Sequence, residues 1–194
     1  MYVQWNGNRK MDVPVWSLPP KLTCIGATEL CKKICYSNKA WRWQAVRQRR
    51  MENYVHSKSK DFPKAMIKLI QERLEKKPFD KFRIHESGDF YSQEYFDKWC
   101  KIAEAFPNIK FLAFTKSYQI DFSKHPDNLV IYYSVMPDTK IIPKNMRLAF
   151  VIGKGLKYRT IRPTGRVCPY PEKNCRGCGY KCWDGDSNVI FRKH

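Results

Sequence analysis

The residues with the clearest chemical potential are four cysteines close to the carboxyl end of the chain. They follow the spacing C-x6-C-x2-C-x3-C, and four thiolates are enough to close a metal site completely. The surrounding sequence is rich in turn residues and poor in apolar ones, so a bound metal would supply the folding free energy of this segment. The group is more compact than a zinc ribbon, and its Cys-Pro start resembles ferredoxin loops, which favours iron–sulfur over structural zinc. The predicted ligands are Cys168, Cys175, Cys178 and Cys182.

A second group, nearer the amino end, consists of Cys24, Cys31 and Cys35 with the spacing C-x6-C-x3-C. Three thiolates can hold three irons of a [4Fe-4S] cluster and leave the fourth iron open to a substrate or cofactor. A tetrahedral zinc ion would need a fourth ligand, for which His56 and His85 are candidates. The sequence also allows cysteines of both groups to bind a single cluster, with either Cys24 or Cys168 left out.

Metal ligation is a better explanation of these cysteines than disulfide bonding. The chain has 194 residues and 43% hydrophobic content, so it does not need the disulfides that stabilise very small secreted domains. Seven of the eight cysteines fall into the two short groups, where neighbouring thiolates can converge on one metal. The eighth, Cys100, lies in a helix-like stretch and is interpreted as a small core residue.

The charge of the chain indicates a polyanionic partner. The formal net charge is +19, from 37 Lys and Arg against 18 Asp and Glu. Nucleic acid is the first candidate partner and a nucleotide-containing ligand the second, while solubility in a lysine-rich proteome is the alternative explanation. The first twenty residues lack the apolar core of a signal peptide, and no apolar run approaches a membrane span, so we expect a cytoplasmic protein without a membrane partner.

Periodicity predicts three helices that position these groups. The stretch 38–59 has no Gly or Pro and reads as one long basic helix with Asn38 as N-cap. The stretch 62–77 carries one apolar stripe, and the stretch 92–106 is a helix capped by Ser92. The stripe consists of Met66, Ile67, Ile70 and Leu74.

A short strand within 13–16 and four later strands complete the fold. The later strands begin at residue 81 or 82 and at 109, 128 and 147, and they are nearly continuous apolar runs, which is typical of a parallel sheet covered on both faces. The order strand, helix, strand over 82–115 is a crossover unit. The later connections are too short for full helices, so they hold a turn or two, or one strand pair is antiparallel.

The fold class is therefore α/β, with a small parallel-rich sheet or an abbreviated (β/α) partial barrel, helices and a cysteine-rich C-terminal segment. We expect an α/β core over 1–160 that includes the N-terminal cysteine loop. The segment 161–194 would bind metal and pack on this core, so that both form a single domain.

Polar residues follow the strands at the edge where ligand sites of parallel sheets lie. The need for turn residues explains the glycines at these positions, but explains the lysines and carboxylates less well. His85, beside Glu86, fits a site role and a structural hydrogen bond equally. We predict a cofactor pocket lined by Glu86, Ser87, Gly88, Asp89, Lys116 and Ser134, with Lys154 on the substrate side.

Two basic stretches are candidates for a nucleic-acid surface. In the first, arginines occupy two faces of the predicted helix 38–59 beside tryptophans, so phosphate contacts and base stacking are both available. The alternative is that a tryptophan packs against the sheet and the arginines are simply solvated. The second stretch, 154–166, precedes the C-terminal cysteines. The predicted nucleic-acid contacts are Arg42, Trp43, Arg47, Arg49, Arg50, Lys157 and Arg159.

Two passages carry a resemblance to a known family: "SLPPKLTCIGATELCKKICYSNKAWR" and "FRIHESGDFYSQEYFDKWCKIAEAFPNIKFLAFTKS". They resemble a family of small phage proteins known as gene product eighty-eight, and the resemblance extends from about Ser17 to Cys182. It implies a phage protein in the host cytoplasm, but it implies no biochemical activity.

A remoter resemblance is to the radical S-adenosylmethionine (SAM) superfamily. There, a three-cysteine loop after the first strand holds a cluster that binds SAM, and a glycine-containing turn after the second strand supports the SAM amino group. The resemblance assigns these roles to Cys24, Cys31 and Cys35 and to the turn 86–89. The superfamily spacing is C-x3-C-x2-C, which differs from this chain, and the chain is short for a six-stranded partial barrel.

Together these features predict an iron–sulfur protein with one or two [4Fe-4S] clusters and SAM as a candidate cofactor. The leading hypothesis is a radical-SAM-like enzyme, or a relative of one, that binds or acts on nucleic acid. The alternative is a non-enzymatic nucleic-acid-binding protein in which zinc or a cluster is structural.

Overall fold

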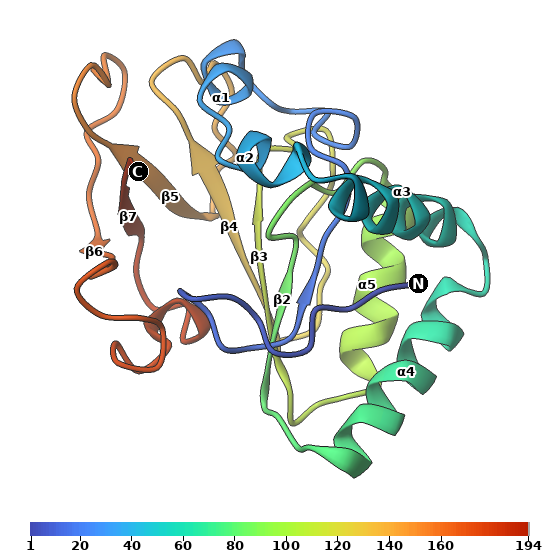
Figure 1. Ribbon diagram of the computed structural model, residues 1–194. Coiled ribbons are helices and arrows are strands. Elements are labelled where there is room, and N and C mark those ends of the chain that lie inside the picture. The colour runs from blue at the N-terminus through green and yellow to red at the C-terminus, as the bar shows by residue number, and fades with distance from the viewer. Residues whose placement is uncertain (194) are drawn as a thin grey trace.

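The computed structural model describes residues 1–193, which form one continuous seven-stranded sheet with helices (Figure 1). The strand order is β1-β2-β3-β4-β5-β7-β6, and every neighbouring pair is parallel. The predicted α/β class with a parallel sheet is confirmed, and of the two alternatives for the short later connections, the one with an antiparallel strand pair is wrong. The strands are β1 (Val15–Trp16), β2 (Lys81–Ile84), β3 (Lys110–Thr115), β4 (Leu129–Val135), β5 (Arg147–Ile152), β6 (Arg166–Val167) and β7 (Val189–Arg192).

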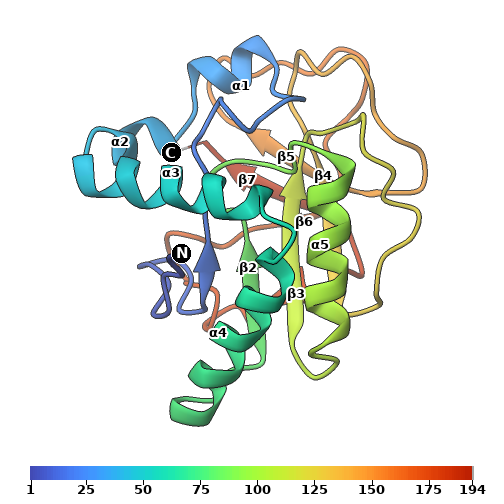
Figure 2. The same cartoon turned by 90° about the vertical axis from the view of Figure 1, so that its right-hand side faces the viewer.

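The helices within residues 44–104 cover one face of this sheet (Figure 2). Two shorter helices lie in the N-terminal cysteine loop, within residues 29–41, and one 3-10 turn lies in the C-terminal segment. The connections after β3 and β4 contain no helix, as their lengths predict. The helices are α1 (Glu29–Lys33), α2 (Ser37–Trp41), α3 (Gln44–Lys58), α4 (Phe62–Lys76) and α5 (Gln93–Glu104), and the 3-10 turn is η1 (Lys181–Trp183).

The helical face holds the largest apolar cluster of the protein. Phe82 and Ile84 of β2 alternate with polar neighbours and pack among Trp16, Phe62 and Trp99, all of them fully buried. Each such side chain contributes about 1.5–3 kcal/mol through its burial. The predicted stripe of α4 faces this cluster, with Met66, Ile67, Ile70 and Leu74 all in contact with it.

The opposite face of the sheet is covered by the cysteine-rich segment instead of helices. A second apolar cluster joins Leu112 of β3, Tyr132 of β4 and Val189 of β7 to Trp183 of η1. Cys168, Cys175 and Cys182 pack against the same cluster. The C-terminal segment also supplies β6 and β7, so it completes the sheet as well as covering it.

The predicted helix over 38–59 is broken, which corrects the sequence interpretation. Trp43 is extended, with φ −81° and ψ 124°, and separates α2 from α3. The Arg47 guanidinium donates hydrogen bonds to the carbonyls of Trp41 and Arg42, which satisfies the end of α2 and holds the break. Asn38 lies inside α2 and is therefore not an N-cap. By contrast, the Ser92 hydroxyl accepts a hydrogen bond from the Tyr95 amide, which confirms the predicted cap of α5.

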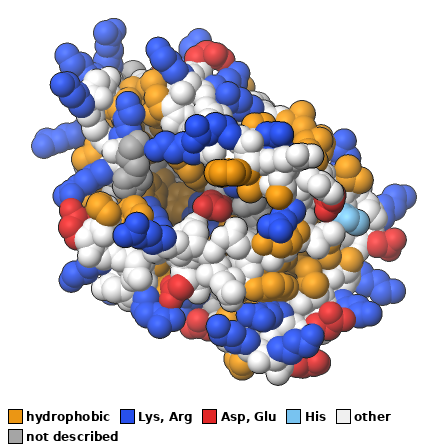
Figure 3. Space-filling view, in the orientation of Figure 1, with side chains coloured by type: hydrophobic (Ala, Val, Ile, Leu, Met, Phe, Trp, Pro, Cys, Tyr) orange, Lys and Arg blue, Asp and Glu red, His pale blue; other side chains and the backbone are white. Residues whose placement is uncertain are grey.

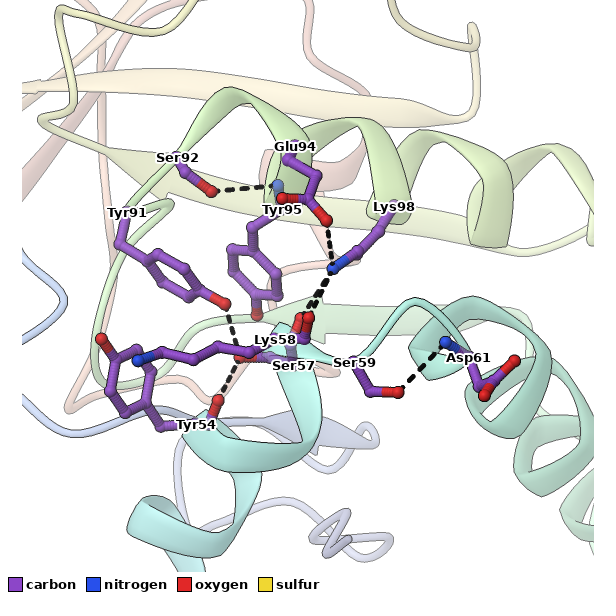
Figure 4. A network of polar contacts seen from close by, with 10 residues as sticks. All are labelled: Tyr54, Ser57, Lys58, Ser59, Asp61, Tyr91, Ser92, Glu94, Tyr95 and Lys98. Carbon is purple, nitrogen blue, oxygen red and sulfur yellow. Dashed lines mark hydrogen bonds and ion pairs between the residues drawn. The ribbon is translucent and has the colours of Figure 1, made fainter.

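A buried lysine fixes α3 against α5 (Figure 4). Lys98 of α5 is 7% exposed, and its ammonium donates to the carbonyls of Ser57 and Lys58 at the end of α3. The same ammonium pairs with Glu94 at 2.9 Å, and the Ser57 hydroxyl lies 2.8 Å from the Tyr91 hydroxyl. These contacts satisfy the last carbonyls of α3 and so set the direction of the basic helix.

Candidate metal centres and nucleic-acid interface

The N-terminal cysteine loop begins where β1 ends and lies beyond the carboxyl ends of the first strands. Thr28 caps α1 by accepting a hydrogen bond from the Cys31 amide at 3.1 Å, so a short helix places this cysteine. The three thiols of the loop are partly buried. Cys31 and Cys35 act electrostatically on Cys24, and Cys35 acts on Cys31. The three predicted ligands Cys24, Cys31 and Cys35 therefore share one loop, although their thiols are not already arranged to hold a metal ion.

The turn after β2 packs tightly on this loop. Gly88 has φ +85°, and a Cβ there would lie 2.5 Å from the Leu18 Cβ, so only glycine fits without strain. Asp89, which is 5% exposed, accepts hydrogen bonds from the amides of Phe90 and Lys116, both at 2.8 Å. This carboxylate ties the turn after β2 to the turn after β3.

The turn after β3 also meets the loop. A Cβ at Gly26 would lie only 1.7 Å from the Lys116 carbonyl oxygen, so the two backbones are in direct contact. The Tyr36 hydroxyl donates to the Glu86 carbonyl oxygen from the other end of the loop. Ser87 is 3% exposed, and its hydroxyl has no hydrogen-bond partner among residues 1–193.

The remaining predicted pocket residues lie further from the loop. Ser134 is a half-buried residue of β4, and Lys154 is exposed in the loop after β5. Neither makes a hydrogen bond or ion pair with the N-terminal cysteine loop within the described residues.

Burial keeps the thiols of Cys24 and Cys31 protonated. It raises the pKa of Cys24 to about 12, with a further contribution from the Asp89 carboxylate. It also raises the pKa of Cys31, although the Lys116 ammonium opposes this rise. Burial likewise raises the pKa of Asp89. A bound metal cation would favour the deprotonated thiolates instead, since cysteine binds metal as the thiolate.

The C-terminal thiols form a separate group on the helix-free face of the sheet. The thiols that perturb Cys175 and Cys182 all belong to this group, whereas those that perturb Cys24 belong to the N-terminal group. This arrangement favours two centres over one shared cluster. Burial, the largest cause, raises the pKa of Cys175 to about 11 and that of Cys182 to about 12.

The first residues of the chain hold this C-terminal group in place. The Cys175 amide donates to the Lys10 carbonyl at 2.9 Å, and the Tyr180 hydroxyl donates to Asp12 at 2.6 Å. Arg176 pairs with the same carboxylate at 2.7 Å. The sequence did not point to this contact, because it joins the two ends of the chain.

Both cysteine groups have the right chemistry for metal binding, but their thiols are not arranged as the ligands of a bound metal. All eight cysteines are free thiols, and within residues 1–193 no three or more His, Cys, Asp or Glu side chains are already arranged to hold a metal ion. Closing a tetrahedral site would require the thiols to deprotonate and approach one another, which normally occurs together with metal binding.

A hollow opens on the helix-free side of the sheet, below α1 and α2 in the orientation of Figure 3. Figure 3 shows hydrophobic side chains in its floor and Lys and Arg side chains around it. The strand residues on the helical side, such as Thr115 and Tyr133, are 1% exposed, whereas Phe114 and Ser134 on the other side are only half-buried. The carboxyl ends of β3 and β4 are therefore accessible from this side.

The basic stretch around α3 is exposed, with one exception. Trp43 is 70% exposed and does not pack against the sheet. Arg42, Arg47 and Arg49 are exposed, and the Arg49 guanidinium lies 4.4 Å from the centre of the Tyr2 ring. Lys157 and Arg159 are exposed in the loop after β5.

Arg50 does not fit the predicted nucleic-acid surface. It is 8% exposed, and its Nη1 atom is buried without a hydrogen-bond partner among the described residues. Its side chain lies on the inner side of α3, where Glu86, Tyr36 and Cys35 act on its charge. The prediction of Arg50 as a nucleic-acid contact is therefore wrong, because its side chain is buried.

Comparison with known proteins identifies the family. A sequence model of the family described as Gene product 88 matches residues 3–154. The chain belongs to the Gene product 88 family. The matched region contains the N-terminal cysteine group and the turns after β2 and β3, and it ends before the C-terminal cysteines.

Two phage proteins are similar to this Gene product 88 family member. The Gene 88 protein of Mycobacterium phage L5 is 28% identical over 199 residues, which covers 87% of this chain and 81% of that protein. The Gene 88 protein of Mycobacterium phage D29 is 25% identical over 200 residues, with the same coverage of both chains. These relatives support the prediction of a phage protein. No solved structure matches the chain. In the part of the chain that the structure describes, no helix has the length and apolar character needed to cross a membrane.

Proposed function

We propose that this Gene product 88 family member is an iron–sulfur protein of the host cytoplasm with a radical-SAM-like site at its N-terminal cysteines. The observation that carries the proposal is the convergence of three thiols with the turns after β2 and β3. It occurs at the carboxyl edge of an all-parallel sheet, beside an accessible face. Ligand sites of parallel sheets lie at this edge.

The chain would use its residues as follows. Cys24, Cys31 and Cys35 would hold a [4Fe-4S] cluster, which would supply an electron and one iron free to bind a cofactor such as SAM. The buried Asp89 keeps the turns after β2 and β3 together by its hydrogen bonds to their amides. Ser87 would offer a polar atom beside the loop, since its hydroxyl has no partner in residues 1–193.

The C-terminal cysteines would hold a second metal centre. Four thiolates can coordinate zinc or a second [4Fe-4S] cluster, and either would stabilise a segment that has little core of its own. The spacing and the Cys-Pro start favour the cluster, with zinc as the alternative. In either case this centre would be closed by protein ligands and structural in role.

Nucleic acid is the proposed partner or substrate. The net charge of +19 provides a general attraction to phosphates. Trp43 offers an exposed aromatic ring beside exposed arginines, which suits stacking on an unpaired base. The same exposure favours the second candidate function, a non-enzymatic nucleic-acid-binding protein whose metal is structural.

SAM binding separates these two functions. Protein reconstituted with iron and sulfide under argon should bind SAM in equilibrium dialysis, and its visible spectrum should change. Cys31→Ser should abolish both effects, whereas Cys100→Ser, which lies outside both groups, should leave them unchanged. Absence of SAM binding by the reconstituted protein, or equal binding by the Cys31 variant, would exclude the radical-SAM-like site and leave the binding protein.

A further inference from the structure

Arg83 is a buried arginine on the helix-free face of the sheet. It belongs to β2 and is 8% exposed, with its guanidinium 4.2 Å from the centre of the Phe114 ring. Its Nε and Nη2 atoms both donate to the carbonyl of His85 at 3.2 Å. These are contacts to neutral groups, so they position the charge without balancing it.

The charge of Arg83 has no carboxylate partner in residues 1–193. None of the ion pairs within 4.0 Å includes this residue. Arginine keeps its proton in proteins, and a buried charge without a counter-charge costs several kcal/mol. The fold therefore places a positive charge where some negative group is needed.

The C-terminal thiols share an apolar cluster with the aromatic ring on which Arg83 lies. Phe114, on which Arg83 lies, packs in the same cluster as Cys168, Cys175 and Cys182. Cys182 and Cys175 both act on the pKa of Arg83, which burial lowers as the largest effect. Tyr36 and Glu86, from the region of the N-terminal cysteines, also act on this charge.

We propose that Arg83 is the counter-charge of a metal–thiolate centre held by Cys168, Cys175, Cys178 and Cys182. Four thiolates around Zn²⁺, or around a [4Fe-4S] core of charge +2, leave a net charge of about −2 on the centre. A buried guanidinium beside such a centre stabilises it, and the centre in turn balances the guanidinium. The inference rests on the proposed metal binding and adds a residue outside the ligand set.

The proposal predicts effects of opposite sign in the metal-bound and metal-free protein. Arg83→Met keeps similar volume and removes the charge, so metal affinity should fall at least about tenfold, or about 1.4 kcal/mol. The metal-free variant should be as stable as the metal-free parent or more so, because an unbalanced buried charge is gone. Arg83→Lys keeps the charge and should retain most of the affinity.

The experiment uses Zn²⁺ as the probe in the full chain, with a chromophoric chelator as competitor and a phosphine reductant. The parent protein for all variants carries serine at Cys24, Cys31 and Cys35, so that only the C-terminal cysteine group can bind Zn²⁺. Urea unfolding of each metal-free protein gives its stability. Lys173→Met is the matched control, since Lys173 is an exposed charge in the same segment, and its affinity should stay within about twofold of the parent.

Each outcome decides between distinct conclusions. If the parent binds no Zn²⁺, both the C-terminal metal centre and the role of Arg83 are excluded. If the parent binds Zn²⁺ and Arg83→Met binds it equally well, metal binding stands and the counter-charge is excluded. If metal-free Arg83→Met is less stable than the parent, Arg83 serves instead to clamp the His85 carbonyl, and the proposal is overturned.

Discussion

His85 should make the stability of this protein sensitive to mild acid. The side chain is 2% exposed, its Nε2 atom lies 2.9 Å from the Tyr95 hydroxyl, and its Nδ1 atom has no hydrogen-bond partner in residues 1–193. Burial, with a smaller effect of the Arg83 charge, lowers the pKa of His85 from 6.5 to about 3. The folded protein therefore keeps this imidazole neutral.

The sign and size of the effect follow from linkage. Below pH 6.5 His85 binds a proton in the unfolded chain, whereas in the folded chain it stays neutral down to about pH 3. The free energy of unfolding therefore falls as the pH falls through this window. The loss is about 1.4 kcal/mol per pH unit. At pH 4.5 the residue alone should cost about 2.5 kcal/mol relative to pH 7.

Urea unfolding at pH 7 and pH 4.5 isolates this contribution when wild type is compared with His85→Asn. Asparagine suits the left-handed backbone at this position, where φ is 61°. The free energy of unfolding of wild type relative to the variant should fall by about 2.5 kcal/mol between pH 7 and pH 4.5. His125→Asn, at an exposed position, should show a constant difference. A difference for His85→Asn that stays constant within about 0.5 kcal/mol would refute the reasoning.

Three further predictions concern the parts that position the site. Gly88→Ala should destabilise the fold by at least about 1–2 kcal/mol in urea unfolding, because it adds left-handed strain and a contact of 2.5 Å with Leu18; unchanged stability would contradict the tight turn. Lys98→Met should cost about 2–3 kcal/mol, since two carbonyls at the end of α3 lose a charged donor; a loss under about 0.5 kcal/mol would show that these bonds contribute little. Trp43→Ala should weaken single-stranded nucleic-acid binding by about 1–3 kcal/mol in fluorescence anisotropy. Arg42→Gln should reduce the slope of log affinity against log salt concentration by about 0.7–0.9. No change in either variant would place the interface elsewhere.

The core of the candidate site was accessible to sequence reasoning. The carboxyl ends of neighbouring parallel strands must meet at one edge, so the turn 86–89, Lys116 and the N-terminal cysteine loop could be expected to converge. The structure brings them into direct backbone contact at Gly88 and Gly26. The metal, cofactor and partner assigned to this site stay predictions.

Other features depend on contacts that no local pattern records. The helix break at Trp43 is held by a side-chain hydrogen bond from Arg47 back to the carbonyl of Arg42, which no sequence pattern predicts. In the same arginine-rich stretch, nothing in the sequence indicates that the Arg50 side chain is buried. β6 and β7 are short and pair across a turn-rich segment, so their apolar runs were too brief to recognise. Arg83 did leave a signal, because it is a single charge inside the buried strand β2.

Metal and sulfide analysis of protein purified without oxygen tests the central claim most directly. We expect a brown protein with iron and acid-labile sulfide in about equal amounts, at about four irons per cluster. Serine at Cys24, Cys31 and Cys35 should remove one cluster, and serine at all four C-terminal cysteines should remove the other centre. A colourless protein with stoichiometric zinc, or with no metal, would contradict the iron–sulfur account.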